Sequence, residues 1–154
     1  MPRIKPYRLL VLAARSWHDY EFLQQEFLRL ASIHRKIVVI WPHDTERWQL
    51  EIMDWCKKNP EQFIAKPYEK NVGLYGYGED EGRDWRMFWD EYPDEVWKIE
   101  STKNYKRRPT DAVWPHLWDM AQANNMTCIM FSAPRRRNMQ KPLMNVRKKK
   151  IRPA

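Results

Sequence analysis

Two short apolar runs place the strongest constraint on the fold of this chain. They are RLLVLAA at residues 8–14 and KIVVIW at residues 36–41. Polar residues bound the first run, and β-branched residues dominate the second, as is typical of strands buried on both faces of a sheet. A segment with apolar residues at helical spacing follows each run. This alternation predicts parallel strands joined by helices that pack on the sheet.

The alternation continues along most of the chain. Further strands are expected at residues 61–66, 95–100 and 126–132. Helices are expected at residues 19–34, about 45–59 and 83–92, and a last helix follows the basic loop and ends near residue 125. The segment 95–100 carries enough charge to predict a partly exposed strand. The predicted fold class is α/β: a single Rossmann-like three-layer domain, residues 1–133, with a mostly parallel five-stranded sheet.

Local signals predict where the helices begin and which faces they bury. Ser16 and Asp19 fit a capping box at the start of the first helix. Asp44 or Thr45 is expected to cap the second helix. The third helix is expected to face the core with its aromatic residues, which are Trp85, Phe88, Trp89 and Tyr92.

Positive charge is concentrated at the C-terminal end of the sequence. The net charge is +8, but residues 1–132 hold 19 basic and 20 acidic residues and are therefore nearly neutral. Residues 134–154 contain three prolines and no apolar periodicity, which predicts an extended basic arm. The basic residues of this arm are Arg135, Arg136, Arg137, Lys141, Arg147, Lys148, Lys149, Lys150 and Arg152.

Such an arm is suited to nucleic acid, because each Lys or Arg that meets a phosphate releases a counterion. A basic loop is expected to extend the same surface through Lys103, Lys106, Arg107 and Arg108. RNA or DNA is therefore the expected partner. An acidic protein partner and a merely solubilising tail stay open as alternatives.

Cysteine content and hydropathy indicate the compartment. Cys56 and Cys128 lie in apolar-periodic segments, so we expect buried thiols in a reducing, cytoplasmic environment. No apolar run approaches the roughly 18 residues that a membrane span needs, and the N-terminal run is too short for a signal peptide. The histidines and cysteines show no metal-ligand spacing, so neither a metal nor a cofactor is expected.

Ligands of open α/β sheets bind beyond the carboxyl ends of the strands. Residues expected there, and predicted as ligand contacts, are Arg15, Ser16, Trp17, Trp41, His43 and Asp44. An exposed tryptophan at this edge can stack on a base, which is the role predicted for Trp17 and Trp41. The alternative is that both indoles close the end of the sheet. The dipeptides His18-Asp19 and His43-Asp44 stand at two adjacent strand ends and could form a general acid–base pair. The alternative for them is that the aspartates are helix N-caps.

Two stretches resemble a known family. RLLVLAARSWHDYEFL is similar to the first strand, turn and helix of the SLOG superfamily, which contains the Lonely Guy phosphoribohydrolases and related binders of nucleotide-derived ligands. GRDWRMFWDEYPDEVWKIES resembles the segment in which an arginine-led helix precedes a strand. The resemblance covers about residues 7–132, and it implies a Rossmann-like fold with Arg83, Arg86 and Ser101 at the ligand.

The chain departs from this family at both phosphate-binding turns. WPHDTERW stands where family members have a Gly-Gly-Ala-x-Gly-Ala-Asp turn, and STKNYKRRPTD stands where enzymatic members have Pro-Gly-Gly-x-Gly-Thr. Side chains at these positions keep backbone N–H groups away from phosphate. We therefore predict a small accessory protein, of the kind that phages encode, that binds nucleic acid and has a degenerate nucleotide pocket without catalytic residues.

Three other functions stay open at this point. The first is a binder or sensor of a small nucleotide-derived ligand, and the second is a modulator that binds a host protein. The third is a hydrolase of N-glycosidic or phosphoribosyl bonds, which needs a carboxylate in the pocket. Asp44, Glu100 and Asp111 are the candidates for that carboxylate.

Overall fold

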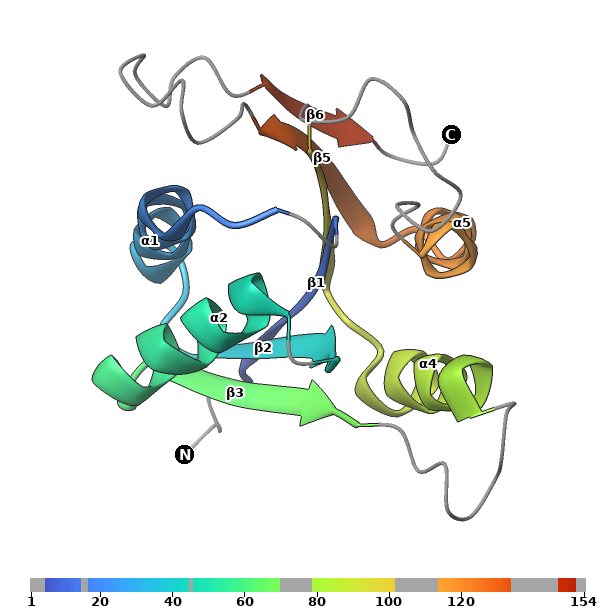
Figure 1. Cartoon of the computed structure of the whole chain (residues 1–154), viewed down its shortest axis with the longest axis horizontal. Helices are drawn as coiled ribbons and strands as arrows, with labels where there is room; N and C mark the ends of the chain where they lie inside the picture. The colour runs from blue at the N-terminus through green and yellow to red at the C-terminus, as the bar shows by residue number, and fades with distance from the viewer. Residues whose placement is uncertain are drawn as a thin grey trace.

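A computed structural model describes residues 5–14, 17–44, 46–69, 79–101, 114–133 and 147–151. The elements in chain order are β1 (Tyr7–Ala13), α1 (Tyr20–Ala31), β2 (Ile37–Pro42), α2 (Arg47–Lys58), β3 (Phe63–Tyr68), α4 (Glu79–Glu91), β4 (Glu95–Ser101), α5 (Pro115–Ala123), β5 (Thr127–Ala133) and β6 (Arg147–Ile151). Figure 1 shows the sheet between two helical layers, with α1 and α2 on one face and α4 and α5 on the other.

The sheet has the strand order β3-β2-β1-β4-β5-β6. Strands β1 to β5 are parallel, and β6 runs antiparallel to β5. The predicted Rossmann-like α/β fold with five parallel strands is confirmed. The strands that follow β1 in the chain add to the sheet first on one side, as β2 and β3, and then on the other, beginning with β4. The switch point therefore lies at β1, which pairs with both β2 and β4. A crevice for ligands is expected at the carboxyl end of such a switch point.

The core forms where the two apolar runs predict it. Residues of β1 and β2 from Leu9 to Ala13 and from Ile37 to Trp41 are all buried. Phe27 of α1 stacks on Trp97 of β4, with ring centroids 5.8 Å apart. Aromatic side chains from the helical layer therefore close the core over the central strands.

Strand β4 is central in the sheet and mostly buried, so the predicted partial exposure holds only for Lys98 and Glu100, which are half-buried. The charged residues that suggested exposure have partners. The Glu95 carboxylate accepts hydrogen bonds from Tyr7 Oη at 2.7 Å and from Trp97 Nε1 at 2.5 Å. Lys98 Nζ lies 3.4 Å from Glu100 Oε1. Buried charge is tolerated when it is paired and hydrogen-bonded. The composition of the segment does not reveal these partners, so it suggested exposure.

Two helix caps differ from their predictions. Asp19 is itself the N-cap of α1 and accepts a hydrogen bond from Phe22 N at 3.2 Å, so it is not the third residue of a box that begins at Ser16. The N-cap of α2 is Glu46 rather than Asp44 or Thr45. Gln49 Oε1 accepts from the backbone N–H groups of Asp44 at 2.7 Å and Glu46 at 3.3 Å. One glutamine side chain therefore satisfies two donors at the start of this helix.

The buried face of α4 is rotated from the predicted one. Phe88 is buried and Trp85 is half-buried, but Trp89 and Tyr92 are 49% and 50% exposed. Among residues 82–91 of this helix, the buried positions are instead Arg83, Asp84, Met87, Phe88 and Glu91. Three of these five side chains are ionisable, and they are buried in ion pairs. An apolar-periodicity argument therefore gives the wrong phase for this helix.

Part of the basic arm is built into the sheet. Strand β6 pairs with β5 in a register that runs from Ser132↔Arg147 to Cys128↔Ile151. Such a strand is held by backbone hydrogen bonds and does not require apolar side chains. A prediction based on apolar periodicity therefore missed it. The basic loop and the other basic residues of the arm lie outside the described residues.

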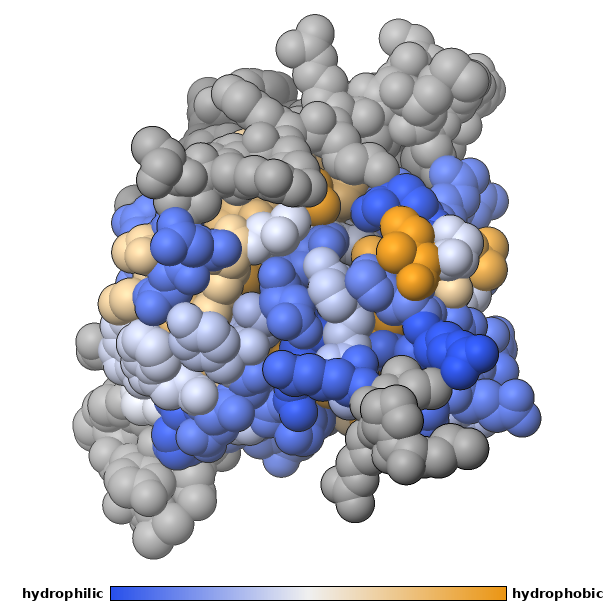
Figure 2. Space-filling view, turned by 180° about the vertical axis from the view of Figure 1, so that it is seen from behind, coloured by the Kyte–Doolittle hydropathy of each residue, from blue (hydrophilic) through white to orange (hydrophobic). Residues whose placement is uncertain are grey.

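Two surface properties complete the description. Seen from behind, the described surface is mostly hydrophilic, and its strongly hydrophobic residues form separate patches (Figure 2). Within the described part of the chain, no helix is both long enough and apolar enough to cross a lipid bilayer.

Candidate functional site

Charged side chains meet at the carboxyl edge of the sheet, beyond β2 and β3. Asp44 follows β2, Tyr68 ends β3, Arg83 and Asp84 lie in α4, and His116 lies in the first turn of α5. We call the last three residues, Arg83, Asp84 and His116, the α4–α5 charge cluster. Parallel strands bring these segments together because their carboxyl ends share one edge.

Arg83 connects this edge to α4. Its side chain is 2% exposed, and its Nε donates to Asp84 Oδ1 at 2.8 Å. Its Nη1 lies 3.4 Å from Asp44 Oδ1 and 3.4 Å from the carbonyl oxygens of His43 and Tyr68. Because its nitrogens face these partners, Arg83 holds the ends of two strands against the helix.

Asp84 has a hydrogen-bond partner at each carboxylate oxygen. Oδ1 accepts from Arg83, and Oδ2 lies 3.0 Å from His116 Nε2. Burial raises the pKa of Asp84 above its ordinary value, and the Arg83 and His116 side chains oppose that rise. The carboxylate is thus a buried bridge between α4 and α5, and it sets the orientation of an imidazole ring.

His116 is the member of the cluster that reaches solvent. Its side chain is 38% exposed, and its ring lies edge-on to Trp85 with centroids 5.6 Å apart. A carboxylate on one ring nitrogen orients an imidazole for proton transfer at the other. Neither Asp84 nor His116 was predicted as a site residue. The available signal was the position of His116, directly after Pro115 at the start of a helix on the carboxyl edge.

The two tryptophans predicted to stack on a base are buried. Trp17 is 3% exposed and Trp41 is fully buried, and Trp41 Nε1 donates to His43 Nδ1 at 2.9 Å. A buried indole has no free face for a base, so the stacking prediction is wrong. Their burial agrees with the alternative, in which both indoles close the end of the sheet. Of the two aspartates predicted as possible helix caps, Asp19 is one, whereas Asp44 is an ion-pair partner.

The remaining predicted ligand contacts are placed only in part. Arg86 is half-buried in α4, one turn after Arg83. Ser101 ends β4 opposite Ala133 of β5. Arg15, Ser16 and the candidate carboxylate Asp111 lie outside the described residues. His43, Asp44 and Arg83 are therefore the predicted contacts that the structure brings together.

A second buried carboxylate lies on the other side of Tyr68. Glu91 accepts hydrogen bonds from Lys66 Nζ at 2.8 Å and from Tyr68 Oη at 2.5 Å, and it pairs with Arg8. Burial works to raise the pKa of Glu91, but these hydrogen bonds and the two cations outweigh it and lower the pKa. Since every partner comes from the sheet, Glu91 anchors the C-terminal end of α4 on β1 and β3.

Neither cysteine is activated for chemistry. Burial raises the pKa of Cys56 to about 12 and that of Cys128 to about 11. Both thiols are buried, as predicted, and they stay protonated at neutral pH. Among the described residues, no group of three or more His, Cys, Asp or Glu side chains could hold a metal ion.

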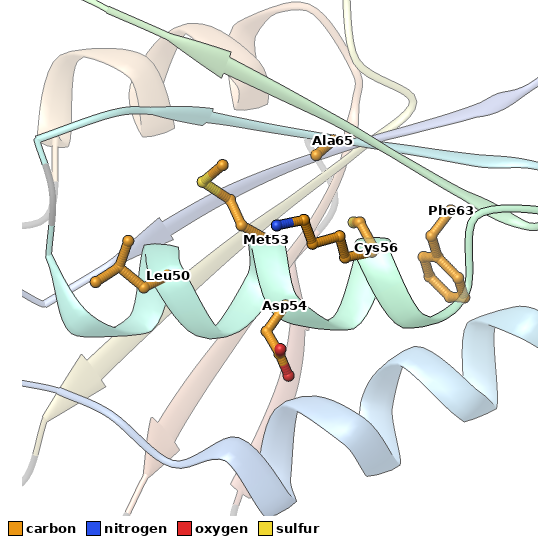
Figure 3. A pocket seen from close by; sticks show the side chains of 7 residues that line it. Leu50, Met53, Asp54, Cys56, Phe63 and Ala65 are labelled. Atoms are coloured by element: carbon orange, nitrogen blue, oxygen red, sulfur yellow. The ribbon is translucent and has the colours of Figure 1, made fainter.

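An apolar groove lies away from the charge cluster, between α2 and the edge strand β3. It has a volume of about 510 Å³ and is lined by Leu50, Met53, Asp54, Cys56, Lys57, Phe63 and Ala65. Figure 3 shows Leu50 and Met53 on the side of α2 that faces β3, and Asp54 on the side that faces α1. None of the predicted site residues lines this groove.

Comparison of the chain with protein-family models, with curated proteins and with solved structures finds no match. The resemblance to the SLOG superfamily therefore stays a prediction.

Proposed function

We propose that this protein binds RNA or DNA through the basic edge strand β6. The observation that carries the proposal is the pairing of residues 147–151 with β5. Four consecutive basic residues, Arg147 to Lys150, follow the backbone of this strand. At roughly 3.3 Å per residue, this backbone segment spans about 10 Å of the sheet edge.

Two features favour nucleic acid as the partner. The body of the chain is nearly neutral, so positive charge is a local property of this edge and of the adjoining basic segments. The strand also begins at the carboxyl edge, because Arg147 pairs with Ser132 near the end of β5. A basic segment whose backbone is held in a sheet meets phosphates with less loss of backbone entropy than a free tail does.

The test needs the full chain. A chain that ends at Ala133 would lack β6 and would leave the edge of β5 open, so its loss of binding would be ambiguous. The sharper variant replaces Arg147, Lys148, Lys149 and Lys150 by Gln in one protein. The matched control replaces four exposed cations of the body by Gln, namely Arg35, Lys36, Arg47 and Lys57.

Binding to labelled single- and double-stranded RNA and DNA is then measured over a range of salt concentrations. The β6 variant is expected to reduce the slope of log K against log salt by about 3, since each phosphate contact contributes roughly 0.7–0.9. The control variant keeps the slope of the original protein. An equal reduction of the slope in both variants, or no reduction in the β6 variant, would contradict the proposal.

A second candidate function is the binding of a small nucleotide-derived ligand at the carboxyl edge. The contact between Asp84 and His116 favours it, because it aims a partly exposed imidazole at this edge. Ligands that bind only the folded state raise the melting temperature. A nucleotide panel is therefore expected to stabilise the chain and to lose that effect in His116→Ala. Release of free base in the same samples would indicate the hydrolase alternative.

A further inference from the structure

Two aromatic side chains lie exposed at the C-terminal end of α4. Trp89 and Tyr92 are 49% and 50% exposed, and their rings stack with centroids 6.2 Å apart at an angle of 30°. Phe88 packs edge-on beneath Trp89, with centroids 5.1 Å apart. We call Trp89 and Tyr92 the α4 aromatic pair. Tryptophan and tyrosine are enriched among residues that dominate binding energy at protein interfaces.

Tyr92 of this pair has an unfavourable backbone conformation. Its φ angle is 42°, in the left-handed region, where its N–H closes α4 by donating to Phe88 O at 2.9 Å. Glycine is the usual residue at such a helix end, because any Cβ disfavours this conformation. A bulky residue in a strained conformation at the surface indicates a role other than stability.

The exposed charges beside the pair in the chain are acidic, whereas Arg86, one turn before Trp89, is half-buried. Asp90 follows Trp89, and Asp94 stands two residues after Tyr92; both are exposed, and Asp94 Oδ2 accepts a hydrogen bond from Arg8 N at 2.9 Å. Glu91 between them turns to the sheet, where Arg8 and Lys66 neutralise it. The exposed end of α4 therefore presents aromatic faces together with carboxylates.

We infer that the α4 aromatic pair is a docking site for an arginine-bearing segment of a protein partner. A guanidinium stacks on an indole face and pairs with carboxylates at the same time. Phosphate is disfavoured here by Asp90 and Asp94, so nucleic acid is a poor occupant. The site is also separate from β6, since α4 lies near β2 and β3 at the other end of the sheet (Figure 1).

The probe is a capped synthetic peptide of arginine alternating with glycine, and its lysine counterpart serves as the comparison. Binding to the full chain is measured by fluorescence anisotropy at physiological salt. The arginine peptide is expected to bind roughly threefold tighter than the lysine peptide, as exposed cation–π contacts give. Equal affinity for the two peptides would overturn the proposal, because it would leave only non-specific charge attraction.

Tyr92→Gly separates binding from stability. Glycine suits the left-handed backbone, so the melting temperature is expected to stay the same or rise while the preference for arginine is lost. Trp89→Lys is expected to abolish binding without a change in melting temperature, since Trp89 is half-exposed. If Tyr92→Gly lowers the melting temperature and retains the preference for arginine, the tyrosine is structural and the proposal fails.

Matched controls are available at Leu28 of α1 and at Ile33, two residues after the end of that helix, which are 58% and 64% exposed. Leu28→Ala and Ile33→Ala are expected to leave peptide binding unchanged. An equal loss in these variants would contradict a site on α4. Sedimentation of each protein tests the other occupant: self-association that Trp89→Lys removes would identify a second copy of this chain and would overturn the proposal.

Discussion

Oδ2 of Asp84 lies 3.0 Å from Nε2 of His116, a residue 32 positions further along the chain. The other oxygen of the same carboxylate accepts a hydrogen bond from Arg83 at 2.8 Å. One buried carboxylate in the second turn of α4 therefore contacts the first turn of α5 at the carboxyl edge. These two helices are held together by charge and not only by apolar packing.

Replacing Asp84 by Asn keeps the size of the side chain but leaves Arg83 buried without its closest anion. Breaking a buried ion pair from one side typically costs about 3–5 kcal/mol. We expect a loss of this size in the free energy of unfolding, measured by urea denaturation. Asp119→Asn, at an exposed position of α5, is the control and should change stability by less than about 0.5 kcal/mol. Similar small effects in both variants would show that the bridge adds little.

Stability is expected to fall in acid through Glu91. Its pKa is lower in the folded chain than its ordinary value, so the folded state favours the ionised form. The stability from this linkage is present above the ordinary pKa of 4.5 and is lost as the pH falls through the lower folded pKa. Unfolding free energies of the original protein and Glu91→Gln, measured from pH 7 to pH 3, should converge toward the acid end. If the unfolding free energies of the two proteins differ by the same amount at every pH, Glu91 does not cause the loss of stability in acid.

Pro67 is expected to protect the edge strand β3 from self-association. The carbonyl oxygens of Gln62 and Tyr68 accept from Ile37 N and His43 N at 2.8 Å, so alternate residues of β3 face β2. Pro67 therefore faces the outer edge, where a missing N–H blunts strand pairing.

Pro67→Thr restores a donor at that edge and is expected to increase oligomers in sedimentation velocity. Pro60→Thr, in an exposed turn, is the matched control and should leave the oligomer content unchanged. If neither substitution alters the oligomer content, Pro67 has no protective role.

Cys56 and Cys128 are expected to be unreactive in the folded chain. Burial raises the pKa of Cys56 to about 12 and that of Cys128 to about 11, and only thiolates react quickly with electrophiles. A thiol reagent at pH 8 should label neither residue until urea unfolds the protein, when both should react together. Rapid labelling of one cysteine without denaturant would show that its segment opens locally.

The candidate site was predictable only where local sequence carries the signal. His43 and Asp44 were expected at the carboxyl edge because they follow a strand, Arg83 was expected there from the resemblance to the SLOG superfamily, and the three residues meet there. Trp17 and Trp41 were expected at the same edge, but exposure depends on what packs over a residue. Asp84 and His116 were not foreseen, because each is unremarkable until the fold brings the other within hydrogen-bond distance.

By itself, the sequence determined the order of the elements, the five parallel strands and the core of β1 and β2. The physical reason is that a strand buried on both faces needs a continuous apolar run, which is a local property. The tertiary structure alone decided the phase of α4, the central place of β4 and the addition of β6 to the sheet. Each of these depends on a partner distant in the chain: an ion pair for a buried charge, or a neighbouring backbone for an edge strand.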